Sequence, residues 1–362
     1  MRVFGPVIPG NYNTGSFLTP HPVYGRFHVP GFDGWVKTRE FTSRITINAL
    51  GLRGPERGFE KPAGTQRIML LGDSFTEAAQ VAERESTVSR LESALNARGT
   101  GRYEVLNAGV GGWGTGQQLV YLREEGYRHQ PDLVVVMLYL GNDIFDNSYA
   151  LQGSPRNPHE PYWTFRNDGT FEPMEFRLRR AADVNPVVQV LRERTLLYNV
   201  FETGVLVKLE DDEDGEDLRA NRFNLNKFIV HQRKSSDKQD DAWRITLTLL
   251  QRVRQLGEER GFQTAVVLAP AAFQVYDDEW NDTIAQNKLK PDDWAPDLPN
   301  AVIAANAGMV GAPMLDLLGA LHDAAPTSER LYFPYDKHWT AAGHEVAARE
   351  IERFLVESSL VR

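Results

Sequence analysis

Short apolar runs alternate with amphipathic stretches over most of the chain. Near-continuous hydrophobic runs predict buried strands at residues 68–71, 103–107, 132–140, 264–269 and 313–317. Hydrophobic residues three or four apart predict helices at residues 86–97, 116–125, 242–256 and 341–357. Buried strands alternating with amphipathic helices are typical of a parallel sheet covered by helices on both faces. The pattern therefore predicts an α/β fold.

Two regions interrupt this alternation. Residues 1–65 are rich in Gly, Pro, Asn and Thr, and contain a short extended run at 40–47. They predict an N-terminal extension that either packs on the core or forms one wall of a substrate cleft. Residues 66–362 predict one α/β domain with an insertion at about 144–240, which includes a helix at 185–206 and an acidic run at 210–217. The acidic run lacks the spacing of an EF-hand, which favours a solvated loop over a calcium site.

Composition and charge exclude several classes of protein. The chain has 40 basic and 49 acidic residues, a net charge of −9, and no basic patch, so nucleic acid is not an expected partner. No apolar run approaches the roughly 18 residues of a membrane span. The absence of cysteine excludes disulfides, thiolate zinc sites and cysteine nucleophiles. With no apolar leader visible, we expect a cytoplasmic protein as the chain stands, and an exported one if a leader was trimmed.

Active sites in open parallel sheets lie beyond the carboxyl ends of the strands. The first strand leads into Gly72-Asp73-Ser74, where a serine at the mouth of a helix is either a nucleophile or a helix N-cap. The third strand leads into Asn142, whose amide could donate to an oxyanion or form an Asx-turn. Each signal is weak when taken singly.

The second strand leads into a glycine-rich loop at 107–115. Glycines let backbone N–H groups approach a ligand closely. Gly109, Gly111 and Gly114 also satisfy the dinucleotide fingerprint G-x-G-x-x-G. That fingerprint calls for an acidic residue at the end of the next strand, but the window at 133–138 is wholly apolar. The dinucleotide-binding alternative stays open on the glycines alone.

The last connection, before the closing helix, contains Asp336-Lys337-His338. The aspartate could orient the imidazole, leaving its other ring nitrogen as a base. Two metal ligands, or a capping aspartate beside a surface histidine, are the alternatives. His344 falls inside the predicted helix, which favours a structural role. Together the strand exits supply the nucleophile, base, orienting acid and oxyanion donors that acyl transfer needs.

With these residues in order, the chain resembles the SGNH (GDSL-like) hydrolases. Ser74 matches the family's nucleophile, Gly112 its oxyanion glycine, Asn142 its oxyanion asparagine and His338 its base. The resemblance implies a three-layer α/β/α sandwich of flavodoxin-like type, and an oxyanion hole made by Ser74, Gly112 and Asn142. It implies no cofactor and no metal.

One departure from the family pattern points to one of its branches. Most members place the acid three residues before the histidine, whereas Asp336 lies two before it and Trp339 follows directly. This block, and the motif INALGLR at 47–53, resemble the branch related to bacterial polysaccharide O-acetyltransferases. The resemblance implies an esterase acting through an acyl-enzyme on a small ester or an acylated carbohydrate, with a short acyl group. An O-acyltransferase that uses a sugar hydroxyl as acceptor is the alternative.

Substrate contacts and other classes of function complete the expectations. Asp73, Trp113, Asp143 and Trp339 are candidate substrate contacts, and Tyr162 and Trp163 are candidate sugar-stacking platforms. A metal-dependent phosphoesterase would instead use carboxylates and an imidazole as metal ligands, namely Asp73, Asp143, Asp336 and His338. A non-catalytic sugar-binding relative is a further alternative.

Overall fold

The computed structural model describes residues 12–13, 16–153, 159–174 and 225–362. One compact unit comprises Met1–Pro173 and Asn226–Arg362, and the other, Met174–Leu225, lies almost wholly outside the described residues. The helix predicted at 185–206 and the acidic run at 210–217 also lie outside the described residues.

The centre of the first unit is a five-stranded parallel sheet with the strand order β12-β11-β8-β6-β7. Its strands are β6 (Thr65–Gly72), β7 (Arg102–Gly109), β8 (Leu133–Tyr139), β11 (Gln263–Ala269) and β12 (Met314–Asp316). Counted along the sheet's own strands, this is the flavodoxin-like order 2-1-3-4-5. The structure confirms the predicted α/β class, and each predicted apolar run coincides with a strand of this sheet.

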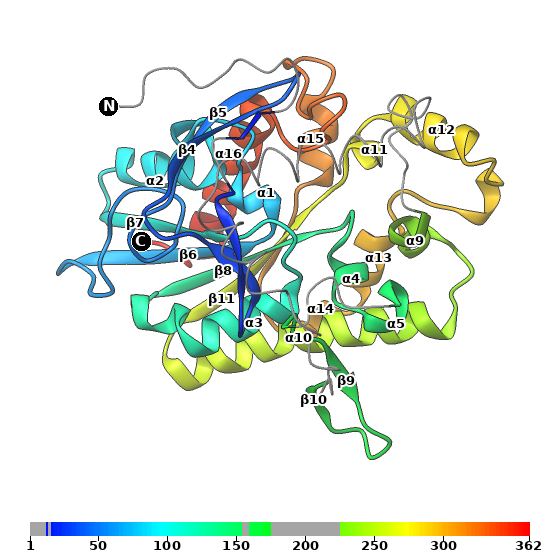
Figure 1. Cartoon of the computed structure of the whole chain (residues 1–362), viewed down its shortest axis with the longest axis horizontal. Helices are drawn as coiled ribbons and strands as arrows, with labels where there is room; N and C mark the ends of the chain where they lie inside the picture. The colour runs from blue at the N-terminus through cyan, green and yellow to red at the C-terminus, as the bar shows by residue number, and fades with distance from the viewer. Residues whose placement is uncertain (1–11, 14–15, 154–158, 175–224) are drawn as a thin grey trace, which may run out of the picture. The chain divides into compact units, whose positions relative to one another are not determined.

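Helices cover both faces of the sheet (Figure 1). On one face, α2 (Thr87–Ala97), α15 (Leu318–Ala324) and α16 (Ala341–Glu357) pack on Ile68, Leu70 and Val135. On the other face, α3 (Thr115–Glu124) and α10 (Asp237–Arg260) pack on Met69, Leu71 and Val136. Successive residues of a strand point to opposite faces, so the apolar runs supply both cores. The result is the three-layer arrangement expected from the sequence.

The remaining elements are short. The extension forms β1 (Tyr12–Asn13), β4 (Asp33–Lys37) and β5 (Thr42–Thr46), which pair as one antiparallel sheet, and a hairpin of β2 (Leu18–His21) and β3 (Gly25–His28). The short helices are α1 (Ser74–Glu77), α4 (Asp143–Asp146), α5 (Tyr149–Gln152), α9 (Leu225–Phe228), α11 (Ala272–Val275), α12 (Asp277–Gln286), α13 (Leu298–Ala305) and α14 (Ala307–Val310). Strands β9 (Trp163–Phe165) and β10 (Phe171–Pro173) pair with each other, and 3-10 turns occupy Glu83–Glu85, Gly126–His129, Ile229–His231 and Pro291–Asp293. No helix within the described residues is both long and apolar enough to cross a membrane.

Candidate active site

Ser74 stands where β6 turns sharply into α1. The Asp73 side chain caps this helix by accepting a hydrogen bond from the Phe75 N–H at 2.9 Å. A Cβ on Gly72 would lie 2.1 Å from Thr76 Oγ1, and one on Gly109 would lie 2.4 Å from the Glu77 nitrogen. Both glycines are therefore needed to let α1 pack against the ends of β6 and β7. This close packing holds Ser74 at the carboxyl edge of the sheet.

Ser74, His338 and Asp336 form one chain of hydrogen bonds. His338 Nε2 lies 2.7 Å from Ser74 Oγ, and His338 Nδ1 lies 2.7 Å from Asp336 Oδ1. Lys337, between the acid and the base, has a left-handed φ of +67°. In this conformation an aspartate two residues before the histidine reaches the imidazole. The short Asp-x-His spacing is thus compatible with a Ser-His-Asp arrangement.

The surroundings of His338 favour its protonated form. Burial acts to lower the pKa of His338, but the hydrogen bond and charge of Asp336, with the charges of Asp73 and Glu77, outweigh burial and raise the pKa above 6.5. A base with a raised pKa is better able to accept the serine proton. The arrangement can therefore support nucleophilic attack by Ser74.

Three hydrogen-bond donors that follow the carboxyl ends of β6, β7 and β8 have no partner among the described residues. The backbone N–H of Ser74, the backbone N–H of Gly112 and the Asn142 Nδ2 form no hydrogen bond to any described residue. Gly112 adopts a left-handed φ of +78°, which glycine accepts without strain. Asn142 is the N-cap of α4, yet its side chain makes no capping bond, contrary to the Asx-turn alternative. Unpaired donors at the carboxyl edge are what an oxyanion hole requires.

The four candidate substrate contacts have buried side chains. The side chains of Asp73, Trp113, Asp143 and Trp339 are each fully buried, at 0% exposure. The indole of Trp113 donates to the Arg26 carbonyl and stacks on Phe27, and that of Trp339 packs edge-on against Phe75. Large aromatic rings beside a catalytic loop gain more from core burial than from exposure.

The candidate sugar-stacking platforms are buried as well. Tyr162 and Trp163 are only 1% and 7% exposed, and Trp163 stacks on Phe171. Neither ring face is open to a ligand. Trp163 packs within the β9–β10 hairpin, and Tyr162 packs edge-on against Tyr149 of α5.

Asp73 and Asp143 form a buried acidic pair beneath the site. Burial raises the pKa of Asp73 to about 6, with further contributions from Asp146 and Glu77. Burial, and then the charge of Asp73, raises the pKa of Asp143 well above its ordinary value. One carboxylate oxygen of each residue has no hydrogen-bond partner. Ionisation of these buried carboxyl groups therefore lowers the free energy of unfolding.

The glycine loop is occupied by protein groups. The Gly111 N–H donates to Glu77 Oε1 at 2.9 Å, and a Cβ on Gly114 would lie 2.7 Å from Asn147 Oδ1. A carboxylate on this loop would repel a dinucleotide phosphate. Packing thus explains the G-x-G-x-x-G spacing, and the dinucleotide alternative has no support in the geometry.

The metal-dependent alternative has no ligand set in the described part of the chain. No three His, Asp or Glu side chains converge there in a way that could hold a metal ion. His344, for which the sequence favours a structural role, is 1% exposed, and its Nδ1 forms a hydrogen bond with Thr87 Oγ1 at 2.8 Å.

Several residues that shape the site have no strong signal in the sequence. Arg53, in the motif at 47–53, donates to the carbonyls of Glu77, the last residue of α1, and of Val81, each at 2.7 Å. Glu40 and Glu279 contact the loop of Asp336 and His338. Glu40 lies almost 300 residues from that loop, so no local pattern could have identified it. Arg53 belongs to the motif at 47–53, and the resemblance of that motif to a family branch assigns no role to the arginine.

Comparison with known families gives two matches. The model of the GDSL-like lipase/acylhydrolase family matches residues 70–293. The model of an SGNH hydrolase-like domain, that of the acetyltransferase AlgX, matches residues 228–361. No curated protein sequence matches the chain significantly.

Solved structures with a similar fold include three esterase or hydrolase proteins. A variant of Axe2, an acetyl-xylooligosaccharide esterase from Geobacillus stearothermophilus, is 12% identical, with a TM-score of 0.42 over 80% of this chain and 94% of that chain. The acetyl xylan esterase AlAXEase is 12% identical, with a TM-score of 0.41 over 82% of this chain and 100% of that chain. LAE5, an alpha/beta hydrolase enzyme from the metagenome of Lake Arreo, Spain, is 12% identical, with a TM-score of 0.42 over 84% of this chain and 99% of that chain.

Proposed function

The chain belongs to the GDSL-like lipase/acylhydrolase family, an esterase family, and on that premise we propose that it removes a short, acetyl-like acyl group from a carbohydrate or small ester. The observation that carries the proposal is the hydrogen-bonded chain Ser74–His338–Asp336. The match to an acetyltransferase-related domain over residues 228–361 supports an acetyl-like group.

The first half of the proposed reaction forms an acyl-enzyme. His338 Nε2 takes the proton of Ser74 Oγ, and Oγ attacks the carbonyl carbon of the ester. The oxyanion that forms accepts hydrogen bonds from the Ser74 N–H, the Gly112 N–H and the Asn142 amide. The carbon–oxygen bond to the alcohol then breaks, and His338 gives its proton to the departing alcohol oxygen. Asp336 stabilises the imidazolium between these two transfers.

The second half returns the enzyme to its starting state. His338 takes a proton from water, whose oxygen attacks the acyl-enzyme carbonyl, and the bond to Ser74 Oγ breaks. Ser74 regains its proton from His338 as the carboxylic acid leaves. A sugar hydroxyl in place of water would make a new ester. The match over residues 228–361 keeps O-acyltransfer to a sugar as the second candidate, because hydrolase and transferase use the same residues.

The experiment compares p-nitrophenyl acetate turnover in wild type, Ser74→Ala and Ser93→Ala, with a chelator present. Ser93 is an exposed serine on α2 and serves as the matched control. We expect turnover and an early acetyl adduct on wild type and Ser93→Ala, and neither with Ser74→Ala. Adding acetylated and free oligosaccharides then measures how the acyl group divides between water and sugar. Turnover that survives Ser74→Ala, or that the chelator abolishes, would refute the serine mechanism.

A further inference from the structure

The turn between β4 and β5 contacts the loop that carries Asp336 and His338. The Glu40 carboxylate accepts a hydrogen bond from the Tyr335 N–H at 2.9 Å and another from the Asp336 N–H at 2.6 Å. On either side of Glu40, the Arg39 guanidinium lies 3.2 Å from the centre of the Tyr335 ring, and the ring centres of Phe41 and Phe333 are 5.3 Å apart. Consecutive residues of the extension therefore hold the backbone of this loop.

The backbone of this loop is strained at Lys337, so contacts from other elements are needed to hold it. Lys337 adopts a left-handed φ of +67°, a conformation that costs a residue with a side chain about 1 kcal/mol or more. The Asp336–His338 bond of 2.7 Å forms around that residue. On the opposite side, Glu279 of α12 forms an ion pair with Lys337 Nζ at 3.0 Å. Glu40 thus holds the backbone before the strained residue, and Glu279 holds its side chain.

The extension also reaches the glycine loop indirectly, through Glu77 of α1. His28 Nδ1 lies 2.8 Å from the Gly51 carbonyl oxygen, and His28 Nε2 lies 2.7 Å from Glu77 Oε1. The same Glu77 oxygen accepts the Gly111 N–H at 2.9 Å, one residue before the Gly112 donor. His28 and Glu77 are 1% and 3% exposed, so solvent does not compete for these bonds. Two catalytic loops are therefore tied to the same extension.

We propose that Glu40 is a positioning residue that sets the Asp336–His338 pair against Ser74, so that the N-terminal extension completes the catalytic machinery. Glu40 touches no reacting atom and acts only through the loop. The inference rests on the proposed function for its kinetic consequence, but its structural consequence is independent of turnover.

The test compares Glu40→Ala, Glu40→Gln and Glu56→Ala with wild type. Glu56 is the matched control because it also belongs to the extension and accepts a backbone N–H, that of Ala49 at 3.0 Å, away from the loop. We expect Glu40→Ala to lower kcat for p-nitrophenyl acetate about 10- to 100-fold, with KM changed less than about twofold. Glu40→Gln keeps one accepting oxygen and should fall between Glu40→Ala and wild type. Glu56→Ala should keep the wild-type kcat.

A second readout follows the histidine itself. The NMR resonance of the His338 Nδ1 proton, assigned by its loss in His338→Gln, reports the bond to Asp336 without any turnover. His338 is influenced by the carboxylates of Asp336, Asp73 and Glu77, and only the Asp336 contact depends on the loop. We expect Glu40→Ala to weaken this resonance and to move the titration of His338 to lower pH.

Two results would overturn the proposal. The first is an unchanged Nδ1 resonance and titration in Glu40→Ala, whatever the activity. The second is a loss of kcat no greater than that of Glu56→Ala, or one explained by a lower melting temperature alone. A wild-type protein without Ser74-dependent turnover would refute the proposed function instead, and the NMR readout would still decide the role of Glu40.

Discussion

Strand β6 has a buried charged side chain near each end, and the two surroundings differ sharply. Near the amino end, Arg67 is 1% exposed, and each nitrogen of its guanidinium donates a hydrogen bond. Just beyond the carboxyl end, Asp73 is 0% exposed, and one of its carboxylate oxygens has no partner. Both ends belong to the same sheet, so the difference lies in what the neighbouring loops supply.

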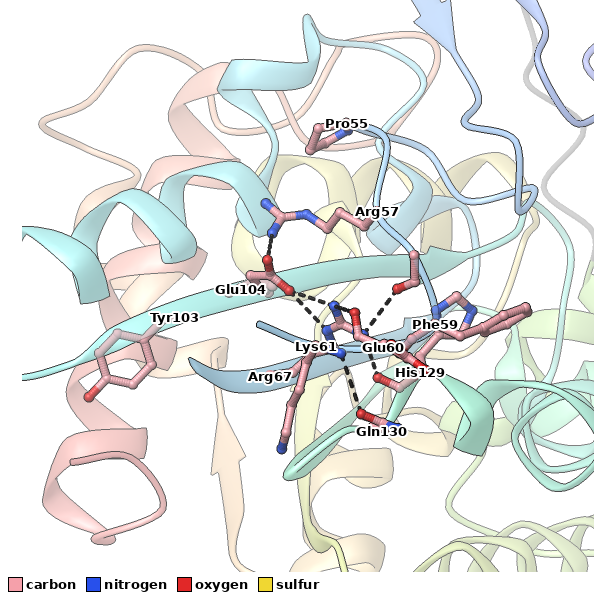
Figure 2. A network of polar contacts seen from close by, with 12 residues as sticks. Pro55, Arg57, Phe59, Glu60, Lys61, Arg67, Tyr103, Glu104, His129 and Gln130 are labelled. Carbon is pink, nitrogen blue, oxygen red and sulfur yellow. Dashed lines mark hydrogen bonds and ion pairs between the residues drawn. The ribbon is translucent and has the colours of Figure 1, made fainter. Parts of the chain in front are cut away.

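The amino end is a closed network (Figure 2). Glu104, the cross-strand neighbour of Arg67 on β7, accepts from its Nε at 3.0 Å and from its Nη2 at 2.7 Å. The carbonyls of Phe59 and His129 accept from Arg67 Nη1 at 2.7 and 2.6 Å, and Arg57 pairs with the other Glu104 oxygen at 3.0 Å. Fully paired buried charges of this kind hold the extension to the strands.

At the carboxyl end, by contrast, several polar groups have no hydrogen-bond partner. This end contains unpaired donors, unpaired carboxylate oxygens and raised pKa values at Asp73, Asp143 and His338. The unpaired groups and the buried carboxylates cost stability, and groups with shifted pKa values concentrate where chemistry is carried out. The comparison teaches that one end of the sheet maintains the fold, whereas the other end contains the residues of the proposed reaction. Separate substitutions can test this division.

The largest expected effect is at the carboxyl end, from Asp336→Asn. We expect kcat to fall by about 10⁴-fold, because the imidazole loses the partner that fixes its tautomer. In wild type, activity should rise with pH through a value above 6.5, since the base must be neutral and its pKa is raised. The substitution removes the charge that raises this pKa, so the rise should move to lower pH. Measurement of kcat/KM against pH checks both statements, and a loss under tenfold would contradict the assigned role.

The next effect is at the closed end, from Arg67→Met. Leaving Glu104 buried without its main partner should lower the free energy of unfolding by about 3–5 kcal/mol, while kcat per folded molecule stays near wild type. Urea unfolding measures the first quantity and active-site titration the second. Arg44→Met is the control, because the exposed Arg44–Asp33 pair is screened by water and should matter little. A large loss of kcat in folded Arg67→Met would break the division between the two ends.

Asn142→Ala should slow catalysis without unfolding the protein. Loss of one oxyanion donor typically costs about 2.7–4 kcal/mol of transition-state stabilisation, or about 10²–10³-fold in kcat. The free energy of unfolding should stay close to wild type, because the amide makes no hydrogen bond to a described residue. Kinetics and urea unfolding on the same preparation check this, and full activity would remove Asn142 from the oxyanion hole.

The smallest expected effect is a gain in stability from Asp73→Asn. Burial raises the pKa of Asp73 in the folded chain from the ordinary 3.8 to about 6. The favourable contribution of the protonated carboxyl group to the free energy of unfolding is therefore complete below pH 3.8 and is lost as pH rises through about 6. The asparagine variant should therefore be more stable than wild type at pH 8, by up to about 3 kcal/mol, and similar to it at pH 3.5. Its amide oxygen can still accept the Phe75 N–H. Equal stability at both pH values would mean that the buried carboxylate has another partner.

Much of the fold was predictable because burial leaves a pattern along the chain. Strand β8 is buried on both faces and is apolar at every position from Leu133 to Leu138. The ends of elements were less predictable. Helix α10 begins at Asp237, earlier than its hydrophobic residues indicate, because Ser236 and Gln239 cap a polar first turn. It ends at Arg260, and Gly261 is its C-cap.

The burial of the candidate substrate contacts has a cause that the sequence does not contain. Trp113 and Trp339 stand beside site residues in the chain, but chain proximity does not determine whether a ring points outward or into a core. Both rings point inward, because packing against Phe27 and Phe75 buries their apolar surface. Glu40 shows the converse, since a residue remote in sequence contacts the loop directly.

By itself the sequence determined the α/β class, the family, and the order in which a serine, a glycine, an asparagine and a histidine follow the strands. These features depend on local periodicity and on short motifs. The tertiary structure alone decided that Asp336 reaches His338 across a left-handed Lys337, that Gly111 is bonded to Glu77 and closed to phosphate, and that the extension holds two catalytic loops. Such contacts join residues far apart in the chain, and only the packing of the whole sheet brings their atoms within hydrogen-bond distance.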